Sequence, residues 1–481
     1  MSNSKNFYIN GTWVAPQTAN DFDVIDPSTE QIIDVISLGS AADVDAAVAA
    51  AKAAFVTWGQ TSKEERVALI EKFLAIYMAR NDELGKAISM EMGAPIDMAC
   101  SSQSGAGTWH SKGILRALQG FEFERAFSER SPSDRLIYEP IGVCALITPW
   151  NWPMNQVVLK VIAALAAGCT MVLKPSEIAP LSSLMFSEMI HEAGFPAGVY
   201  NMVNGDGMGV GSAMTGHPDV DMVSFTGSTR AGIAISKNAA DSVKRVALEL
   251  GGKGANIIFA DADEKAVVRG VRHCFGNSGQ SCNAPTRMLV ERSIYDQAVA
   301  TAVDVATKTQ VGRAADSGRH MGPVVSELQY NKIQGLIQAA IDQGTNLVAG
   351  GTGKPAGFEE GYFVKPTVFA DVSNDMLIAR EEVFGPVLSI IPFDTEAEAI
   401  AIANDTVYGL TNYVQTSDGA KANRMARALR SGMVEMNGTS RANGSPFGGY
   451  KQSGNGREGG VLGMEDFLEV KAISGWDPQQ N

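Results

Sequence analysis

The spacing of apolar residues changes near residue 141. Before it, Ala41–Ala54 and Lys63–Met78 carry apolar residues three and four apart with charges between them, which predicts amphipathic surface helices. After it, short apolar runs end in polar or glycine-containing turns and are followed by helical spacing. These runs are Val143–Thr148, Thr170–Leu173, Met222–Phe225 and Ala255–Phe259. The alternation predicts βα units that build a parallel sheet.

A second series of strand patterns follows Gly251 and predicts another α/β layer. Its candidate strands are Arg287–Val290, Val387–Ile391 and Gly432–Met436. Two such layers in tandem leave a cleft between them, where ligands of α/β proteins usually bind. The charged segment Phe121–Tyr138 lacks helical periodicity, and we expect it to leave both layers together with the tail Phe467–Trp476.

Composition narrows the function classes. The chain has 481 residues, enough for two or three domains, with 45% hydrophobic and 19% charged residues as in ordinary globular proteins. The formal net charge of −14 argues against nucleic acid or an anionic membrane as a partner, because both attract basic surfaces. No apolar run has the length of a membrane span, and the first residues lack a signal-peptide pattern.

Cysteine usage favours a reducing compartment. The five cysteines are few, odd in number and without a C-x-x-C pair, so we expect no disulfide framework and no metal site. This predicts a cytoplasmic protein. Cys282 stands out because it lies in the polar stretch NSGQSCNAP ahead of a strand pattern, where an activatable thiolate is favoured. Cys144 and Cys169, each beside a strand pattern, are typical of buried, inert thiols.

Two polar residues near strand patterns are further catalytic candidates. Glu249 lies in the apolar run ALELGGK, where burial raises a carboxyl pKa toward that of a general base. Its alternative is a solvated glutamate at a strand edge. Asn151 lies in the turn TPWNWP after a strand pattern, where an amide can donate to a developing oxyanion. Its alternative is a turn asparagine that caps its own backbone.

Two turns have the composition of nucleotide-binding turns. VLKPSE ends a strand pattern with Lys174 and Glu177, a donor and an acceptor suited to sugar hydroxyls. FTGSTRAG joins a strand to a helix, where Gly227 and Ser228 offer N–H groups and a hydroxyl to a pyrophosphate. The chain has no strand-linked G-x-G-x-x-G and no Walker A sequence.

Taken in order, several segments resemble the aldehyde dehydrogenase superfamily. They are EPIGVCALITPWNWP, VLKPSE, FTGSTRAG, LELGGK, GQSCNAPTR, EEVFGPV and PFGGYKQSGNGRE. The resemblance implies an α/β fold with a Rossmann-like cofactor domain, an α/β catalytic domain and a small β excursion for oligomerisation. The implied divisions are residues 1–120 with 141–250 for NAD binding, 251–448 for catalysis, and 121–140 with 449–481 for bridging in a homodimer or homotetramer.

The resemblance also implies a role for each matching residue. Cys282 is the nucleophile, Glu249 the base that activates the deacylating water, and Asn151 an oxyanion donor beside the Cys282 N–H. Lys160 matches a lysine that helps relay protons. The residues matched to cofactor binding are Trp150, Lys174, Ser176, Glu177, Gly227, Ser228, Glu382 and Phe384. A carboxylate near the ribose repels a 2′-phosphate, so Glu177 favours NAD, although relatives with KPSE also use NADP.

The implied reaction oxidises a small-molecule aldehyde to a carboxylic acid through a cysteine thioester that water hydrolyses. The implied substrate tunnel is more polar than in common aliphatic-aldehyde members. Its residues here are Trp152, Asn155, Gln156, Leu159, Gly276, Ser281 and Asn283. This favours aldehydes larger or more polar than acetaldehyde. The alternative is a one-residue alignment slip that turns these side chains elsewhere.

The residues leave three other functions open. An acylating dehydrogenase passes the thioester to coenzyme A, but the presence of Glu249 favours hydrolysis. A catalytically silent binding protein is expected to have lost the thiol, the base or the amide, and all three are present. A thiol hydrolase acting on esters needs a base, and none of the five histidines lies in a recognisable base motif.

Overall fold

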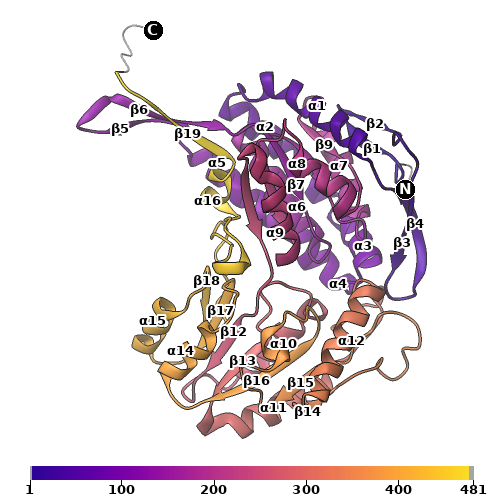
Figure 1. Ribbon diagram of the computed structural model, residues 1–481, viewed down its shortest axis with the longest axis vertical. Coiled ribbons are helices and arrows are strands. Elements are labelled where there is room, and N and C mark those ends of the chain that lie inside the picture. The colour runs from indigo at the N-terminus through magenta and orange to yellow at the C-terminus, as the bar shows by residue number, and fades with distance from the viewer. Residues whose placement is uncertain (1–2, 476–481) are drawn as a thin grey trace.

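The computed structural model describes residues 3–475, which form two α/β bodies and a projecting arm of strands (Figure 1). The first body is built on a sheet of β1 (Phe7–Ile9), β2 (Thr12–Val14), β7 (Val143–Ile147), β8 (Thr170–Lys174), β9 (Tyr200–Met202), β10 (Met222–Thr226) and β11 (Arg245–Glu249). Its helices are α1 (Ala41–Trp58), α2 (Lys63–Ala79), α3 (Asn81–Met92), α4 (Ile96–Met98), α5 (Ser104–Gly120), α6 (Pro153–Ala167), α7 (Leu181–Ala193), α8 (Ser212–Gly216) and α9 (Thr229–Ala239).

Strand β7 shows why helices cover both faces of this sheet. Its side chains alternate between two hydrophobic clusters: Cys144 and Leu146 join the cluster that contains Phe73 of α2, whereas Val143 and Ala145 join the cluster of α1. Every residue of β7 is buried, so the strand appears in the sequence as an unbroken apolar run. Such runs are typical of parallel strands that are covered on both sides.

The strand order of the first sheet creates a place for a ligand. The order is β11-β10-β7-β8-β9-β1-β2, and β7 pairs in parallel with both β8 and β10. The chain therefore proceeds from β7 to one side through β8 and β9, and then returns to the other side for β10 and β11. The carboxyl ends of these strands share one edge, and ligands bind at such a reversal of strand order.

The second body repeats this architecture with a sheet in the order β14-β15-β16-β13-β12-β17-β18. Its strands are β12 (Ala255–Ile258), β13 (Arg287–Glu291), β14 (Asn346–Ala349), β15 (Thr367–Ala370), β16 (Val387–Phe393), β17 (Thr411–Gln415) and β18 (Met433–Met436). Its helices are α10 (Ala266–Phe275), α11 (Tyr295–Lys308), α12 (Glu327–Asp342), α13 (Leu377–Arg380), α14 (Glu396–Asn404) and α15 (Gly419–Ala428). Among the described strands of this sheet, only β14 runs antiparallel to its neighbour.

The arm is a three-stranded antiparallel sheet that leaves the first body (Figure 1). It consists of β5 (Glu124–Ser128), β6 (Ser131–Pro140) and β19 (Leu468–Ile473), with β6 in the middle. The C-terminal chain thus returns from the second body through α16 (Gly460–Glu465) to pair with β6. A separate hairpin of β3 (Asp21–Asp26) and β4 (Gln31–Ser37) completes the N-terminal region.

The expected helices and strands coincide with observed elements, and the α/β class is confirmed. The charged segment 121–138 and the tail lie together, as expected, although Trp476 lies outside the described residues. Apolar periodicity missed β1–β4, because β1 is buried but only three residues long and β2–β4 combine exposed with less exposed positions. The domain boundaries at 120, 141, 250 and 448 stay predictions. Among the helices of residues 3–475, none combines the length and apolar character needed to cross a membrane.

The buried Arg287 is a testable support of the second body. Its guanidinium donates to the carbonyl oxygens of Lys253, Ile402 and Ala403 and to Asn374 Oδ1, at 2.8 to 3.0 Å. Arg287→Met leaves these buried acceptors without a donor, and we expect it to lower the free energy of unfolding in urea by about 2–4 kcal/mol.

The matched control is Arg292→Met, which removes an exposed ion pair with Asp394. Such a pair contributes at most about 1 kcal/mol. Equal stability of the two variants would show that the buried hydrogen bonds of Arg287 do not hold the second body together.

Candidate active site

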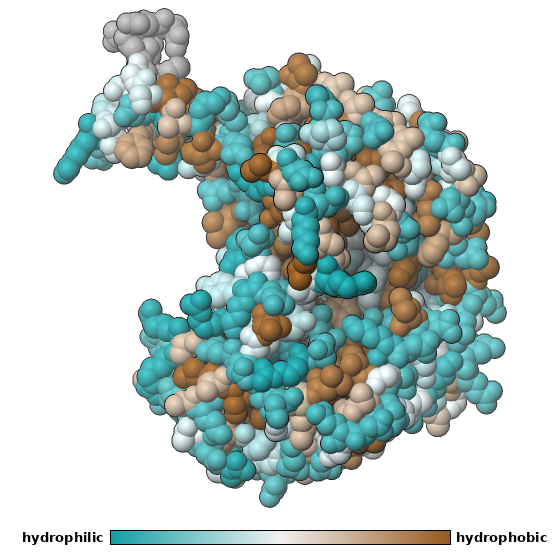
Figure 2. All heavy atoms as spheres, in the orientation of Figure 1, coloured by the Kyte–Doolittle hydropathy of each residue, from teal (hydrophilic) through white to brown (hydrophobic). Residues whose placement is uncertain are grey.

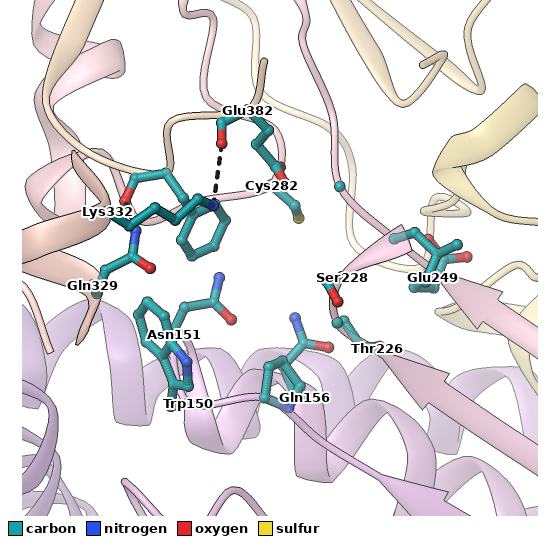
Figure 3. A pocket seen from close by; sticks show the side chains of 15 residues that line it. Trp150, Asn151, Gln156, Thr226, Ser228, Glu249, Cys282, Gln329, Lys332 and Glu382 are labelled. Carbon is teal, nitrogen blue, oxygen red and sulfur yellow. Dashed lines mark hydrogen bonds between the residues drawn. The ribbon is translucent and has the colours of Figure 1, made fainter. Parts of the chain in front are cut away.

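A cleft of about 200 Å³ lies where the carboxyl edge of the first sheet meets the second body. Its lining residues are Pro149, Trp150, Asn151, Gln156, Thr226, Gly227, Ser228, Glu249, Leu250, Gly251, Cys282, Gln329, Lys332, Glu382 and Phe384. In Figure 3, Asn151 and Gln156 enter this space from one wall and Cys282 from the opposite wall, while Glu249 lies at the far side from Lys332. Segments distant in sequence therefore contribute to one cavity.

The loop that carries Cys282 begins with a strained turn between α10 and β13. Asn277, Ser278 and Gly279 are consecutive left-handed residues, with φ of 52°, 56° and 73°. For the two non-glycine residues this conformation costs about 1–2 kcal/mol each. At Gly279 a side chain is also excluded, because a Cβ there would lie 2.1 Å from the carbonyl oxygen of Gly385. The surrounding contacts therefore hold the loop in a conformation that it would not adopt alone.

Those contacts form a buried hydrogen-bond network around Gln103. Gln103 Nε2 donates to the Asn151 carbonyl oxygen and to Asn277 Oδ1, both at 3.1 Å. Asn277 Nδ2 donates to the same Asn151 oxygen at 2.9 Å, and Asn151 Nδ2 donates to the Gln280 carbonyl oxygen at 3.0 Å. The network ties the PWN turn to the cysteine loop. Asn151 is thus not a cap of its own backbone, and its second amide hydrogen has no partner among residues 3–475 and is available to a ligand in the cleft.

The environment of the thiol disfavours its charged form. Burial is the main cause that raises the pKa of Cys282 to about 12, and the carboxylates of Glu382 and Glu249 act in the same direction. The nearby charge of Arg441 acts in the opposite direction. The thiol is therefore protonated at neutral pH, and its activation needs a group that removes the proton or adds positive charge. Cys144 and Cys169 are fully buried, as expected.

Glu249 is buried at the end of β11 rather than solvated, with 3% of its surface exposed. Neither carboxylate oxygen has a hydrogen-bond partner within the described chain. Burial raises the pKa of Glu249 well above its usual value, and the charge of Glu458 adds to the rise. Glu458 accepts a hydrogen bond from Lys160 Nζ at 2.6 Å, and Lys160 also donates to Ser224 at 3.1 Å. A second, small cavity joins Glu249 to Glu458.

One part of the cleft fits a dinucleotide. The rings of Trp150 and Phe384 pack edge to face, with their centroids 5.4 Å apart. Glu382 Oε1 accepts from the Gly252 N–H at 2.8 Å, and its backbone oxygen accepts from Lys332. At the N-terminus of α9, Ser228 caps the helix by accepting from the Ala231 N–H. The buried Thr226 hydroxyl in the same wall has no partner within residues 3–475, so it is free to bind a ligand.

The other expected cofactor residues lie apart from this cavity. Lys174 ends β8 and donates to the carbonyl oxygens of Pro175 and Gly205, with Glu177 at 3.4 Å. Burial lowers the pKa of Lys174. Ser176 lies in the same turn, which adjoins the PWN turn because the Thr148 N–H donates to the Lys174 oxygen. These residues therefore lie along the carboxyl edge of the sheet, outside the cleft.

The expected tunnel residues separate into two groups. Gln156 lines the cleft beside the cofactor candidates. Trp152 and Asn155 instead make other contacts: Trp152 Nε1 donates to Ser281 Oγ at 2.9 Å, and Asn155 Oδ1 lies 2.7 Å from His110 Nε2. Of the remaining positions, Leu159 is buried on α6, and the backbone oxygen of Asn283 accepts a hydrogen bond from the Tyr413 hydroxyl. At Gly276 a Cβ would meet open space.

Sequence reasoning missed several residues of the site. Gln103, Thr226, Gln329, Lys332 and Glu458 all contact the cleft or its network, yet none was singled out. Glu458 and Thr226 lie inside the quoted segments PFGGYKQSGNGRE and FTGSTRAG, so those segments held a signal. Gln103 ends a π-helical turn before α5 (η1, Ala99–Gln103), an irregularity that polar side chains alone do not reveal.

The comparisons with known proteins agree with this geometry. Residues 13–473 match the model of the aldehyde dehydrogenase family. A 3-succinoylsemialdehyde-pyridine dehydrogenase of a Pseudomonas species is 50% identical over 99% of this chain and 100% of its own. A crystal structure of aldehyde dehydrogenase from Bartonella henselae is 61% identical, covers 98% of this chain and 100% of its own, and has a TM-score of 0.98.

A second solved structure carries ligands. It is a mutant of aldehyde dehydrogenase C from Pseudomonas syringae in complex with NAD+ and octanal, 48% identical over 99% of this chain and 98% of its own, with a TM-score of 0.97. The match to the family and the identity to its members extend over nearly the whole chain. The chain therefore belongs to the aldehyde dehydrogenase family.

Proposed function

We propose that this protein oxidises an aldehyde to a carboxylic acid with NAD, through a thioester on Cys282 that water hydrolyses. The observation that carries the proposal is the convergence of one thiol, one free amide N–H and one partner-free buried carboxylate on a single cleft: Cys282, Asn151 and Glu249. Family membership gives the reaction class, and these three groups supply the functions that the reaction needs.

The cleft supports a nicotinamide dinucleotide as the cofactor. Trp150 and Phe384 supply aromatic surface to the cleft wall, Glu382 provides a carboxylate for ribose hydroxyls, and Gly227 with Ser228 present a helix N-terminus to the pyrophosphate. Lys174, Ser176 and Glu177 extend this path toward the adenosine ribose. Glu177 favours NAD over NADP for the electrostatic reason given above. A bound nicotinamide supplies the hydride acceptor of the oxidation.

Acylation begins with the Cys282 thiolate. The sulfur attacks the aldehyde carbon, and the free N–H of the Asn151 amide stabilises the oxyanion together with the backbone N–H of Cys282. When the carbonyl re-forms, the former aldehyde hydrogen leaves with its electron pair as hydride, and a thioester remains on the sulfur. The Gln103 network prepares this step, because it fixes Asn151 and the cysteine loop relative to each other before substrate binds.

Deacylation is the task of Glu249. With its raised pKa, the carboxylate takes a proton from water, and the resulting hydroxide attacks the thioester and releases the carboxylic acid and the Cys282 thiolate. Glu458 and Lys160 lie beyond Glu249 across the small second cavity, which offers the proton a route away from the cleft.

We also propose the finer features of substrate and assembly. Tunnel positions occupied by Asn155, Ser281 and Asn283 support aldehydes larger or more polar than acetaldehyde, and the Pseudomonas relative is named for such a substrate, an aldehyde-bearing pyridine. The arm has open edges at β5 and β19, and hydrophobic side chains lie on its surface (Figure 2). Phe127 and Val470 are exposed there. The arm thus supports a homo-oligomer.

All five cysteines are unpaired, which supports a cytoplasmic location.

Loss of the thiol is the direct test of the reaction. We expect Cys282→Ala to abolish NADH formation from every aldehyde of a panel in the absence of coenzyme A, because no other group in the cleft can form the thioester. Cys100→Ala, which removes a partly exposed thiol elsewhere, is the control and should keep wild-type activity. NADH formation by the wild type only after coenzyme A is added would instead identify an acylating enzyme.

Removal of the base should separate the two half-reactions. Glu249→Gln leaves acylation in place but slows hydrolysis, so we expect a rapid burst of NADH of about one equivalent per active site. Steady turnover should then be slower than in the wild type by about 10²–10⁴-fold. Stopped-flow absorbance measures both phases, with the exposed Glu264→Gln as the control. A slow linear trace without a burst would place Glu249 in acylation rather than deacylation.

The raised pKa of Cys282 predicts a pH dependence for the free enzyme. Far below a pKa of about 12, the thiolate fraction grows by about tenfold for each pH unit. The rate of Cys282 alkylation by iodoacetamide should rise accordingly from pH 7 to pH 10, as followed by mass spectrometry of the modified peptide. A plateau below pH 9 would mean that another group lowers the pKa of the thiol in the free enzyme.

A further inference from the structure

Beside Cys282, residues that do not line the cofactor cleft form a ring made of contacts and of neighbours in sequence or strand register. The ring starts at Asn283, whose backbone oxygen accepts from the Tyr413 hydroxyl at 2.8 Å. Tyr413 on β17 lies beside Glu435 on β18 in the register of the two parallel strands. Glu435 Oε1 lies 3.2 Å from Arg441 Nε. The ring thus runs from the residue after the thiol to an arginine on the loop that follows β18.

The same loop closes the ring on the first body. Asn443 Nδ2 donates to the Trp109 carbonyl oxygen at 2.6 Å, and the next residue, His110, contacts Asn155. Asn155 lies on α6 near Trp152, which donates to Ser281 Oγ at 2.9 Å. Ser281 precedes Cys282, so the ring returns to the thiol. The charge of Arg441 acts on the thiol, so the ring lies close to Cys282 and offers a route by which an aldehyde could reach it.

Arg441 has hydrogen-bond donors without a partner among the described residues. Its guanidinium lies over the Phe447 ring at 4.8 Å, and its Nε faces Glu435. The terminal nitrogens form no hydrogen bond with any residue from 3 to 475, and 26% of the side chain is exposed. The guanidinium is therefore held in place by one ion pair and one aromatic face while its two outer nitrogens remain available.

Asn155 adds a second unused donor. Burial lowers the pKa of His110 to about 4, so the imidazole is neutral at physiological pH and its Nε2–H donates to Asn155 Oδ1. In this arrangement the Asn155 amide hydrogens have no partner within the described residues. The ring consequently presents donors from both bodies, and a purely alkyl chain passing through it would leave those donors without acceptors.

We propose that the preferred substrates are aldehydes with an oxygen acceptor along the chain, and that Arg441 is the specificity-determining residue that binds it, with Asn155 as a second donor. This inference rests on the proposed aldehyde oxidation and names its substrate class. The ion pair with Glu435 compensates the arginine charge, so a neutral ketone oxygen is favoured over a carboxylate.

The test compares aldehydes of equal chain length: hexanal, 4-oxohexanal and 6-oxohexanoate. For the wild type we expect kcat/KM to be highest with 4-oxohexanal. Arg441→Met should lower the ratio of 4-oxohexanal to hexanal by about ten- to hundredfold, because a hydrogen bond from a charged donor is lost. The ratio is the informative quantity: any change in the reactivity of the thiol after loss of the arginine charge affects both substrates and cancels.

Glu435→Gln is the companion variant. It leaves the arginine charge uncompensated, so we expect the preference to move from 4-oxohexanal toward 6-oxohexanoate by about tenfold. Arg441→Gln keeps a neutral donor and should retain an intermediate ratio, and it replaces Arg441→Met if that variant fails to fold.

Either of two results would overturn the inference: a wild type that prefers hexanal, or a ratio that stays within about twofold of the wild type in a folded Arg441 variant. A wild type that prefers 6-oxohexanoate over both other substrates would assign the ring to carboxylates and refute the role of Glu435. Absence of NADH from all three aldehydes would refute the proposed oxidation itself, which is a distinguishable outcome.

Discussion

The geometry of the site depends on the buried side chain of Gln103. It joins the backbone of the PWN turn to the Asn277 amide, and through that amide it supports a turn of left-handed residues that the chain would not adopt alone. Loss of these buried hydrogen bonds would leave several donors and acceptors unpaired. The network therefore holds the strained turn in place. Together they fix the position of Asn151 relative to Cys282.

The cleft contains two carboxylates, Glu382 and Glu249, whose surroundings differ. Glu382 is anchored by the Gly252 N–H and faces the side of the cleft suited to a cofactor, whereas Glu249 has no hydrogen-bond partner among the described residues. Burial raises the pKa of both groups, but Glu249 has both carboxylate oxygens without a partner among the described residues, whereas one oxygen of Glu382 is held by a hydrogen bond. A carboxylate fixed by hydrogen bonds suits binding, and one left free suits proton transfer.

Much of this was readable from the sequence, for definable reasons. Strands such as β7 and β8 are buried on both faces and appear as unbroken apolar runs, and the polar turns at their carboxyl ends led directly to Asn151 and Lys174. Gln103 and Arg441 were not predictable in this way. Gln103 acts through a partner 174 residues away, Asn277, whereas Arg441 contacts Glu435 and Phe447 nearby in sequence but matters only because its loop packs beside the thiol; neither residue lies at a strand end. Local patterns cannot report such pairings, which only the packing of the two bodies creates.

The return of the C-terminal chain to the first body has a consequence for biosynthesis. Glu458 pairs with Lys160, 298 residues earlier, and β19 completes the arm only after that. At a synthesis rate of roughly 5–20 residues per second, Lys160 is without its partner for about 15–60 s on the ribosome. During that interval the nascent first body has an uncompensated ammonium group in its interior and one unpaired side of β6. Chaperones that shield such surfaces would thus be needed most before the last residues emerge, and a prematurely terminated chain would lack both the ion pair and the completed arm.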